Sequence, residues 1–251
     1  MGGHSHWSQV KRQKGASDAK RGQVFTKLGR EIMIAAREGG GDPEMNPRLR
    51  LALAKARENN MPADTIDRAV KRGTGQLEGG QLIDVTFEGY GPGGVAIMVD
   101  VLADNRNRAV SSLRTAFSRG GGSLGESGCV AWQFDSKGLI LVEASDRDPE
   151  EIALMAIDAG AEDVEIEDKR VEVHTAPGDL ERVRRTLEEM EVPVASAELS
   201  MIPKSTISLD DKQAGQVLKL LDTLEELDDV QRVYSNADFP DEVLVEYAGR
   251  S

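Results

Sequence analysis

The order of hydrophobic periods between residues 139 and 201 constrains this fold more than any other feature of the sequence. Apolar residues alternate over short runs, which favours strands, and recur every three or four residues over longer runs, which favours helices. The order is strand, helix, strand, strand, helix, strand, as in a ferredoxin-like split β-α-β unit. The strands are expected at 139–143, 164–167, 171–175 and 195–201, and the helices at 150–159 and 179–189.

Elements on both sides of this unit belong together. Two strands, a helix and a further strand precede it, and a strand, a helix and a strand follow it. A discontinuous α+β domain with the split unit inserted explains that order, and it assigns 80–136 and 203–251 to a middle domain and 137–202 to the insertion. The flanking strands are expected at 82–88, 95–102, 130–134, 205–208 and 230–234, and the flanking helices at 108–119 and 211–226.

The first 79 residues read as a basic arm followed by three helices. Ser17 can cap a helix over 18–37, which glycines 39–41 end. Asn46 and Pro47 are typical of the start of a second helix over 47–58. A third helix is expected from about Pro62 to Gly73. The fold class is therefore α+β, with an N-terminal three-helix domain and two α+β domains.

Charge is distributed very unevenly along the chain. Residues 1–80 carry 15 basic and 9 acidic side chains, a net charge of +6, whereas the remainder carries 16 basic and 35 acidic, a net charge of −19, which gives −13 overall. The acidic remainder would repel a polyanion, so a nucleic acid is expected to meet only the N-terminal part. Between Lys11 and Arg30 there are seven basic residues and one acid, Asp18. Such a cluster suits phosphate contact with counterion release, although a solvated charged face is the simpler explanation of most charge runs.

Three further segments are open to two explanations. The glycines of 89–94 match a dinucleotide-binding pattern, but a strand follows them, so a hairpin turn is expected. The Asn-Arg-Asn-Arg run at 105–108 is either a helix cap with solvated arginines or a polar grip on phosphate or ribose. The segment 120–128 contains five glycines and is expected to be flexible, either as a plain loop or as a loop that orders on binding.

Other classes of protein find little support. The sequence contains no P-loop or HExxH motif, so neither an enzyme, nor a cofactor, nor a metal site, nor a small-molecule substrate is expected. His174 is interpreted as structural. Cys129 is the only cysteine, which fits a reducing, cytoplasmic location. The first 20 residues do not resemble a secretory signal, and no run of about 18 apolar residues predicts a membrane span. The oligomeric state is left open, with a monomer as the expectation.

Specific motifs occur throughout the chain. They are Gly3-His4-Ser5-His6-Trp7, Lys20-Arg21-Gly22, Phe25-Thr26-Lys27-Leu28, Asn60-Met61-Pro62, Lys71-Arg72-Gly73, Tyr90-Gly91-Pro92-Gly93-Gly94, Asp104-Asn105-Arg106-Asn107-Arg108 and Ser127-Gly128-Cys129-Val130-Ala131-Trp132. Together these motifs resemble the YebC/PmpR family, to which the mitochondrial translational activator of a cytochrome oxidase subunit also looks related. His6 stands where many relatives have a lysine, and Cys129 where a small residue is usual.

The resemblance implies the three-domain fold with its insertion, and two functions. One is a ribosome-binding translation factor that relieves stalling on proline-rich stretches, and the other is a DNA-binding transcriptional regulator. The arm and the glycine segment favour recognition of backbone and shape, hence ribosomal RNA over promoter DNA. A protein-interaction scaffold built on the acidic domains is a third possibility.

Two sets of residues are expected to contact nucleic acid. The first set is His6, Trp7, Lys11, Arg12, Lys14, Lys20, Arg21, Lys27, Arg30, Arg48, Arg50, Lys55, Lys71 and Arg72. The second contact region is Tyr90, Asn105, Arg106, Asn107, Arg108, Gly120, Gly121, Gly122, Ser123 and Ser127.

Overall fold

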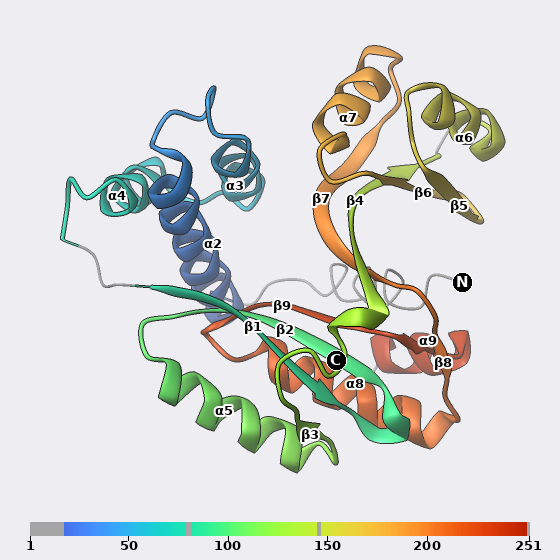
Figure 1. Cartoon of the computed structure of the whole chain (residues 1–251). Coiled ribbons are helices and arrows are strands. Elements are labelled where there is room, and N and C mark those ends of the chain that lie inside the picture. Colours follow the sequence, from blue (N-terminus) through green and yellow to red (C-terminus); the bar gives the residue numbers. More distant parts are fainter. Residues whose placement is uncertain (1–17, 79–81, 145–146, 250–251) are drawn as a thin grey trace. The chain divides into compact units, whose positions relative to one another are not determined.

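A computed structural model describes residues 18–78, 82–144 and 147–249 (Figure 1). These residues form two compact units, one of residues 132–206 and one containing the rest. The helical domain and the middle domain, which the sequence treats as separate, thus belong to one unit. No helix within the described ranges is long and apolar enough to cross a membrane.

The helical domain consists of three helices around a small aliphatic core. Helix α2 packs against both α3 and α4. The core forms because apolar residues recur on one face of each helix, with Ile32, Leu49 and Ala56 fully buried among them. The expectation of three helices is confirmed, and the helices are α2 (Asp18–Gly39), α3 (Pro47–Glu58) and α4 (Ala63–Gly73).

Asn46 fixes the start of α3. Its side-chain oxygen accepts a hydrogen bond from the backbone amide of Leu49, as expected for a helix N-cap. Its side-chain amide donates to the carbonyl oxygens of Ala35 and Gly40, both at 2.8 Å. One buried side chain therefore caps α3 and ties it to the end of α2.

The middle domain contains a four-stranded antiparallel sheet in the order β3-β1-β2-β9. Alternate residues of β2, such as Val99 and Val101, face a core shared with helices α5 and α8. On the other face, Leu102 of β2 contacts Leu82 and Ile34, the latter from α2. The elements are β1 (Ile83–Tyr90), η1 (Pro92–Gly94), β2 (Ala96–Ala103), α5 (Arg106–Arg119), β3 (Ser123–Leu124), α8 (Asp211–Glu225) and β9 (Val230–Ser235).

Because β9 comes from the C-terminal part of the chain and pairs with β2, the middle domain is discontinuous. Two very short parallel strands, β8 (Ile207–Ser208) and β10 (Ala237–Asp238), and the last helix, α9 (Asp241–Gly249), complete it. The sequence analysis did not anticipate β10 or α9.

The inserted unit is the expected ferredoxin-like fold. Its four antiparallel strands lie in the order β5-β6-β4-β7, and helices α6 and α7 lie on one face of the sheet (Figure 1). Its elements are β4 (Phe134–Glu143), α6 (Pro149–Asp158), β5 (Asp163–Glu167), β6 (Arg170–Thr175), α7 (Leu180–Glu189) and β7 (Val194–Pro203).

Two expectations for the segment before the insertion are wrong. Residues 130–134 do not form a strand, because Ala131–Gln133 make a short 3-10 turn (η2) and β4 begins at Phe134. The glycine segment is not a flexible loop either, because Ser123 and Leu124 pair with Tyr90 and Gly89 at the edge of the main sheet.

Candidate nucleic-acid interface

The arm, which carries five of the fourteen residues in the first expected contact set, lies outside the described residues. His6, Trp7, Lys11, Arg12 and Lys14 belong to this arm. Lys20 and Arg21 lie in the first turn of α2, but the structure does not describe their side chains. The geometry below therefore concerns the remaining expected residues.

Two of the expected cations in α2 contact the C-terminal end of α8 and the turn that follows it. Lys27 Nζ donates to the carbonyl oxygen of Glu225 at 2.5 Å, and Gln23, one turn earlier, donates to that of Glu226 at 2.7 Å. Arg30 donates to the carbonyl oxygen of Asp228 at 2.5 Å. The last carbonyls of a helix lack partners within the helix and carry partial negative charge, so Lys27 complements the end of α8, whereas Arg30 contacts the turn that follows it.

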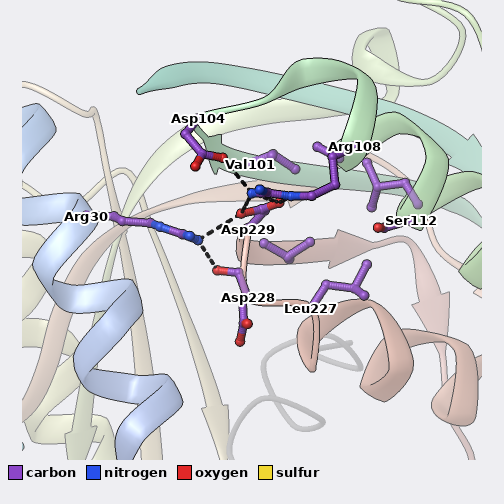
Figure 2. Close-up of a pocket in the computed structure, with 11 residues that line it drawn as sticks. Arg30, Val101, Asp104, Arg108, Ser112, Leu227, Asp228 and Asp229 are labelled. Atoms are coloured by element: carbon purple, nitrogen blue, oxygen red, sulfur yellow. Dashed lines mark hydrogen bonds and ion pairs between the residues drawn. The ribbon is translucent and has the colours of Figure 1, made fainter. Parts of the chain in front are cut away.

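Arg30 and Arg108, which the sequence assigns to different contact regions, converge on one carboxylate (Figure 2). Arg30 Nη1 lies 3.1 Å from Asp229 Oδ1, and Arg108 Nη2 lies 3.0 Å from the same oxygen. Arg108 also contacts Asp104 at 2.6 Å. The hydrogen bonds and charge of Asp229, together with Asp104, raise the pKa of Arg108 above its ordinary value.

These side chains line a pocket of about 380 Å³ that contains Asp104, Asp228 and Asp229 besides the two arginines. Acids outnumber bases there, so the pocket is unsuited to a phosphate. The geometry gives Arg30 and Arg108 a structural role that links α2, α5 and the turn before β9.

Arg48 and Arg50 of α3 also make contacts within the chain. Arg48 contacts Glu31 at 3.0 Å, Glu38 at 2.7 Å and Asp84 at 3.1 Å. Burial opposes the charge of Arg48, but the surrounding carboxylates, Glu31 first, outweigh burial and raise its pKa. Arg50 donates to backbone carbonyls in the turn between α2 and α3.

Helix α4 offers a different surface. Lys71 forms an ion pair with Asp67 one turn earlier, at 2.6 Å. Arg68 and Arg72 are exposed and line a groove of about 480 Å³, whose lining also includes apolar side chains of α2 and of the α3–α4 turn. The apolar lining residues are Phe25, Met33, Met61, Ala69 and Leu82. Lys55 on α3 is exposed and lies outside this lining.

The run at 105–108 performs helix capping. The Asn105 side chain accepts a hydrogen bond from the backbone amide of Arg108, which fixes the start of α5. Arg106 and Asn107 lie in the first turn of α5 and are exposed. Asn105 and Arg108 thus make contacts that hold α5 in place, which leaves Arg106 and Asn107 as the two residues of this run that could contact a ligand.

Glu88 on β1 holds the glycine segment in place. Its carboxylate accepts hydrogen bonds from the backbone amides of Gly128 at 2.6 Å and of Val130 and Ala131, both at 2.8 Å. The Glu88 residue is only 5% exposed. Burial alone would raise the pKa of Glu88, but the three backbone hydrogen bonds outweigh it and lower the pKa below the ordinary value.

Neighbouring contacts add to this anchoring. Tyr90, about one-third exposed, donates its hydroxyl to the carbonyl oxygen of Cys129 at 2.9 Å. Burial and, next, the charge of Glu88 raise the pKa of the Cys129 thiol.

The glycines themselves are packed closely. An added Cβ would lie 2.7 Å from Leu220 at Gly120 and 2.4 Å from the Tyr90 carbonyl oxygen at Gly122, and Gly121 has a positive φ of 76°. Ser123 and Ser127 are exposed. Residues 120–122 therefore act as packing and turn residues, whereas the two serines face solvent.

Glu88, Asp229 and the α2–α4 groove were not anticipated. Glu88 and Asp229 are single acids among 44 in the chain, and their partners lie 40 or more residues away. The sequence offered one signal for the groove, which is the spacing of Arg68 four residues before Arg72. This spacing places both side chains on the same face of a helix.

Comparison with known proteins places the chain among proteins of the same three-part α+β architecture. Family profiles described as the TACO1/YebC protein N-terminal domain and the TACO1/YebC second and third domain match residues 5–76 and 82–237. The chain belongs to the TACO1/YebC family.

Similar proteins cover nearly the whole chain. A probable transcriptional regulatory protein of Dehalococcoides mccartyi is 58% identical over 98% of both chains, and one of Moorella thermoacetica is 56% identical over 97% of this chain and 98% of its own length. The crystal structure of a conserved hypothetical protein from Aquifex aeolicus superposes with a TM-score of 0.87 at 48% identity, covering 95% of this chain and 99% of that one.

Proposed function

We propose that this protein is a non-enzymatic, nucleic-acid-binding regulator of gene expression that acts in the cytoplasm as a ribosomal-RNA-binding translation factor and relieves stalling on proline-rich stretches. The observation that carries the nucleic-acid part is the separation of charge between the basic first 80 residues and the acidic remainder. The proline-specific part comes from the family resemblance alone.

The internal contacts narrow the surface available to a polyanion. Lys27, Arg30, Arg48 and Arg50 already contact carboxylates or carbonyl oxygens of the chain. The basic side chains proposed to contact phosphate are those of the arm and two that line the α2–α4 groove, Arg72 and Arg68, although Arg68 Nε also donates to the carbonyl oxygen of Asp64. In this proposal the arm contacts the phosphate backbone and the groove receives one unstacked base.

The groove suits a base because its lining combines apolar side chains and an aromatic ring, Phe25, with the cations Arg68 and Arg72. Proteins that bind single-stranded nucleic acid combine aromatic stacking with a cationic track for the backbone. Unpaired bases are accessible in the loops and bulges of folded RNA, which is where RNA is usually read. This favours structured RNA.

Helix α4 is poorly suited to reading duplex DNA. It follows α3 after a short turn, as the recognition helix of a helix-turn-helix does, and a recognition helix presents its N-terminal residues to base edges. In α4 those positions include Asp64 and Asp67, which would face phosphates of like charge. The exposed basic residues lie in its C-terminal half instead.

Promoter DNA remains the second candidate target, and the observation in its favour is the name of the curated relatives, probable transcriptional regulatory protein. A scaffold that binds proteins through its acidic domains is the third, and it predicts no effect of the basic arm.

The test measures the affinity of the protein, in the oligomeric state in which it is isolated, for ribosomal RNA fragments and for duplex DNA at a series of salt concentrations. Replacing Lys11, Arg12 and Lys14 by Glu should weaken RNA binding at least tenfold and lower the slope of log affinity against log salt by about 2, since each phosphate contact contributes about 0.7 for single strands. Unchanged affinity and slope would refute the arm as the contact.

The matched control reverses three exposed basic residues far along the acidic part of the sequence, Arg185, Lys212 and Lys219. It changes the net charge of the chain by the same amount. Equal loss in the control and in the arm variant would mean that only net charge matters. Arg68→Ala with Arg72→Ala tests the groove separately, and this pair should reduce RNA binding more than binding to duplex DNA.

A further inference from the structure

The inserted domain contains a group of metal-ligating side chains on its β5–β6 hairpin. Glu165 of β5 lies directly opposite Glu172 of β6, and Asp163 lies opposite His174. Residues two apart in a strand share a face of the sheet, so Glu165, Glu172 and His174 project from the same face. One potential ligand atom from each of these three residues lies within 4.8 Å of the other two.

These side chains are unusually buried for their chemistry. Glu172 is 2% exposed and His174 is 7% exposed, while Glu165 is partly buried. Nε2 of His174 is buried and makes no hydrogen bond to any described residue. Buried polar atoms in folded proteins nearly always have a partner, so an unpartnered imidazole nitrogen beside two carboxylates needs an explanation.

The charges of Glu165 and Glu172, which lie opposite each other on β5 and β6, also favour a bound cation. Two like charges directly opposite each other on neighbouring strands destabilise a sheet, and burial strengthens their repulsion because it lowers the local dielectric constant. A cation held among the three side chains would be attracted to both carboxylates and would give the imidazole nitrogen of His174 a partner.

The donor set indicates the type of cation. Imidazole nitrogen together with carboxylate oxygens suits Zn²⁺ and neighbouring divalent transition metals, whereas Ca²⁺ and Mg²⁺ prefer oxygen ligands alone. The ladder of backbone hydrogen bonds between β5 and β6 fixes the spacing of the three side chains before any ion binds. A site with three protein ligands leaves a coordination position for water.

We propose that Glu165, Glu172 and His174 form a binding site for a divalent transition-metal ion, of which Zn²⁺ is the best fit. The site lies wholly within the inserted domain and stands independently of the nucleic-acid contacts proposed above. It differs from the expectation, drawn from the sequence, that His174 is structural and that the chain has no metal site.

The experiment titrates Zn²⁺ into the metal-free full-length chain by calorimetry, with Co²⁺ as a second probe whose visible absorption changes on coordination. His4 and His6 are the other two imidazoles of the chain, so the titrations use a chain in which both are replaced by Gln. This background should bind one Zn²⁺ ion saturably. His174→Gln and Glu165→Gln should each weaken binding by about tenfold or more.

The matched control is Glu167→Gln, which changes the same residue type on the same strand and the same face. Glu167 lies two residues beyond Glu165 and opposite Arg170. It should alter Zn²⁺ affinity by less than about twofold. The proposal is overturned if the background chain shows no saturable binding, or if Glu167→Gln weakens binding as much as Glu165→Gln does.

A thermal readout covers the case in which His174→Gln fails to fold. Zn²⁺ should raise the melting temperature of the background chain and of Glu167→Gln, since an ion that binds only the folded state stabilises it. It should not raise that of Glu165→Gln, a partly buried position where the substitution removes charge and keeps shape. An equal rise in all three chains would also overturn the proposal.

Discussion

The carboxylate of Glu88 should control the stability of the segment 120–131, and Glu88→Gln tests this most directly. Glu88 Oε1 accepts from the amide of Gly128, and Oε2 accepts from the amides of Val130 and Ala131. A glutamine has only one oxygen at these two positions. If that oxygen faces Val130 and Ala131, its NH₂ group faces the N–H of Gly128, and two donors meet.

The magnitude follows from these bonds. The substitution removes at least one hydrogen bond to a charged acceptor and leaves a buried donor unpaired, which costs about 2–3 kcal/mol. Glu88 is 5% exposed, so water cannot easily replace the lost acceptor. A local cost of about 2.7 kcal/mol corresponds to about a hundredfold faster opening of the segment, at about 1.36 kcal/mol for each tenfold change.

Native-state hydrogen exchange at the amides of Gly128, Val130 and Ala131 is the suitable assay, because it reports local opening in a chain with two compact units. Exchange of these amides should accelerate about 30-fold to 160-fold in Glu88→Gln. Glu126→Gln is the control, since Glu126 lies in the same segment and is exposed. Equal exchange in Glu88→Gln and in the native chain would refute the proposed anchoring.

The lowered pKa of Glu88 also fixes the direction of a pH effect. A carboxyl group with a lower pKa in the folded state contributes its stability above the pKa of the unfolded state, about 4.5, and loses it as the pH falls through the folded-state value. The difference in stability between the native chain and Glu88→Gln should therefore be full at neutral pH and shrink below about pH 4.5.

Four further substitutions have defined outcomes in chemical denaturation. Asp229→Asn removes the charge that Arg30 contacts at a site where both side chains are largely buried, so it should destabilise the protein by about 2 kcal/mol, and a loss under about 0.5 kcal/mol would contradict this role. Asn46→Ala removes an N-cap acceptor and two donated hydrogen bonds and should cost about 2–3 kcal/mol. Gly215→Ala should stabilise helix α8 by about 0.5–1 kcal/mol, because an added Cβ meets nothing within 4 Å, whereas Gly122→Ala should destabilise, because its Cβ would collide with a backbone oxygen at 2.4 Å.

Much of the fold could be predicted from local patterns. Helix α3 was expected at its observed bounds because Asn46 and Pro47 mark its start and aliphatic residues recur along one face. The ferredoxin-like insertion was expected because its strands and helices alternate cleanly. Very short strands were not predicted, because two-residue strands such as β3 and β10 are too short to show a hydrophobic period.

The candidate site could be predicted only in part, because its geometry depends on partners distant in the sequence. In the sequence, Lys27, Arg30 and Arg72 look alike, because each is a basic residue on a predicted helix. Only the folded chain places the first two against carbonyl oxygens about 198 residues away. Arg72 instead lines a groove with Arg68. Composition identifies the basic domain, and tertiary structure determines which of its cations are available.

The most direct test of the central claim is ultraviolet crosslinking of the full-length protein to nucleic acid in living cells, followed by sequencing of the attached molecules. The account predicts reads concentrated in a few elements of ribosomal RNA, and loss of those reads when Lys11, Arg12 and Lys14 are replaced by Glu. Reads concentrated at promoters, with ribosomal RNA at background level, would contradict it and support a DNA-binding transcriptional regulator.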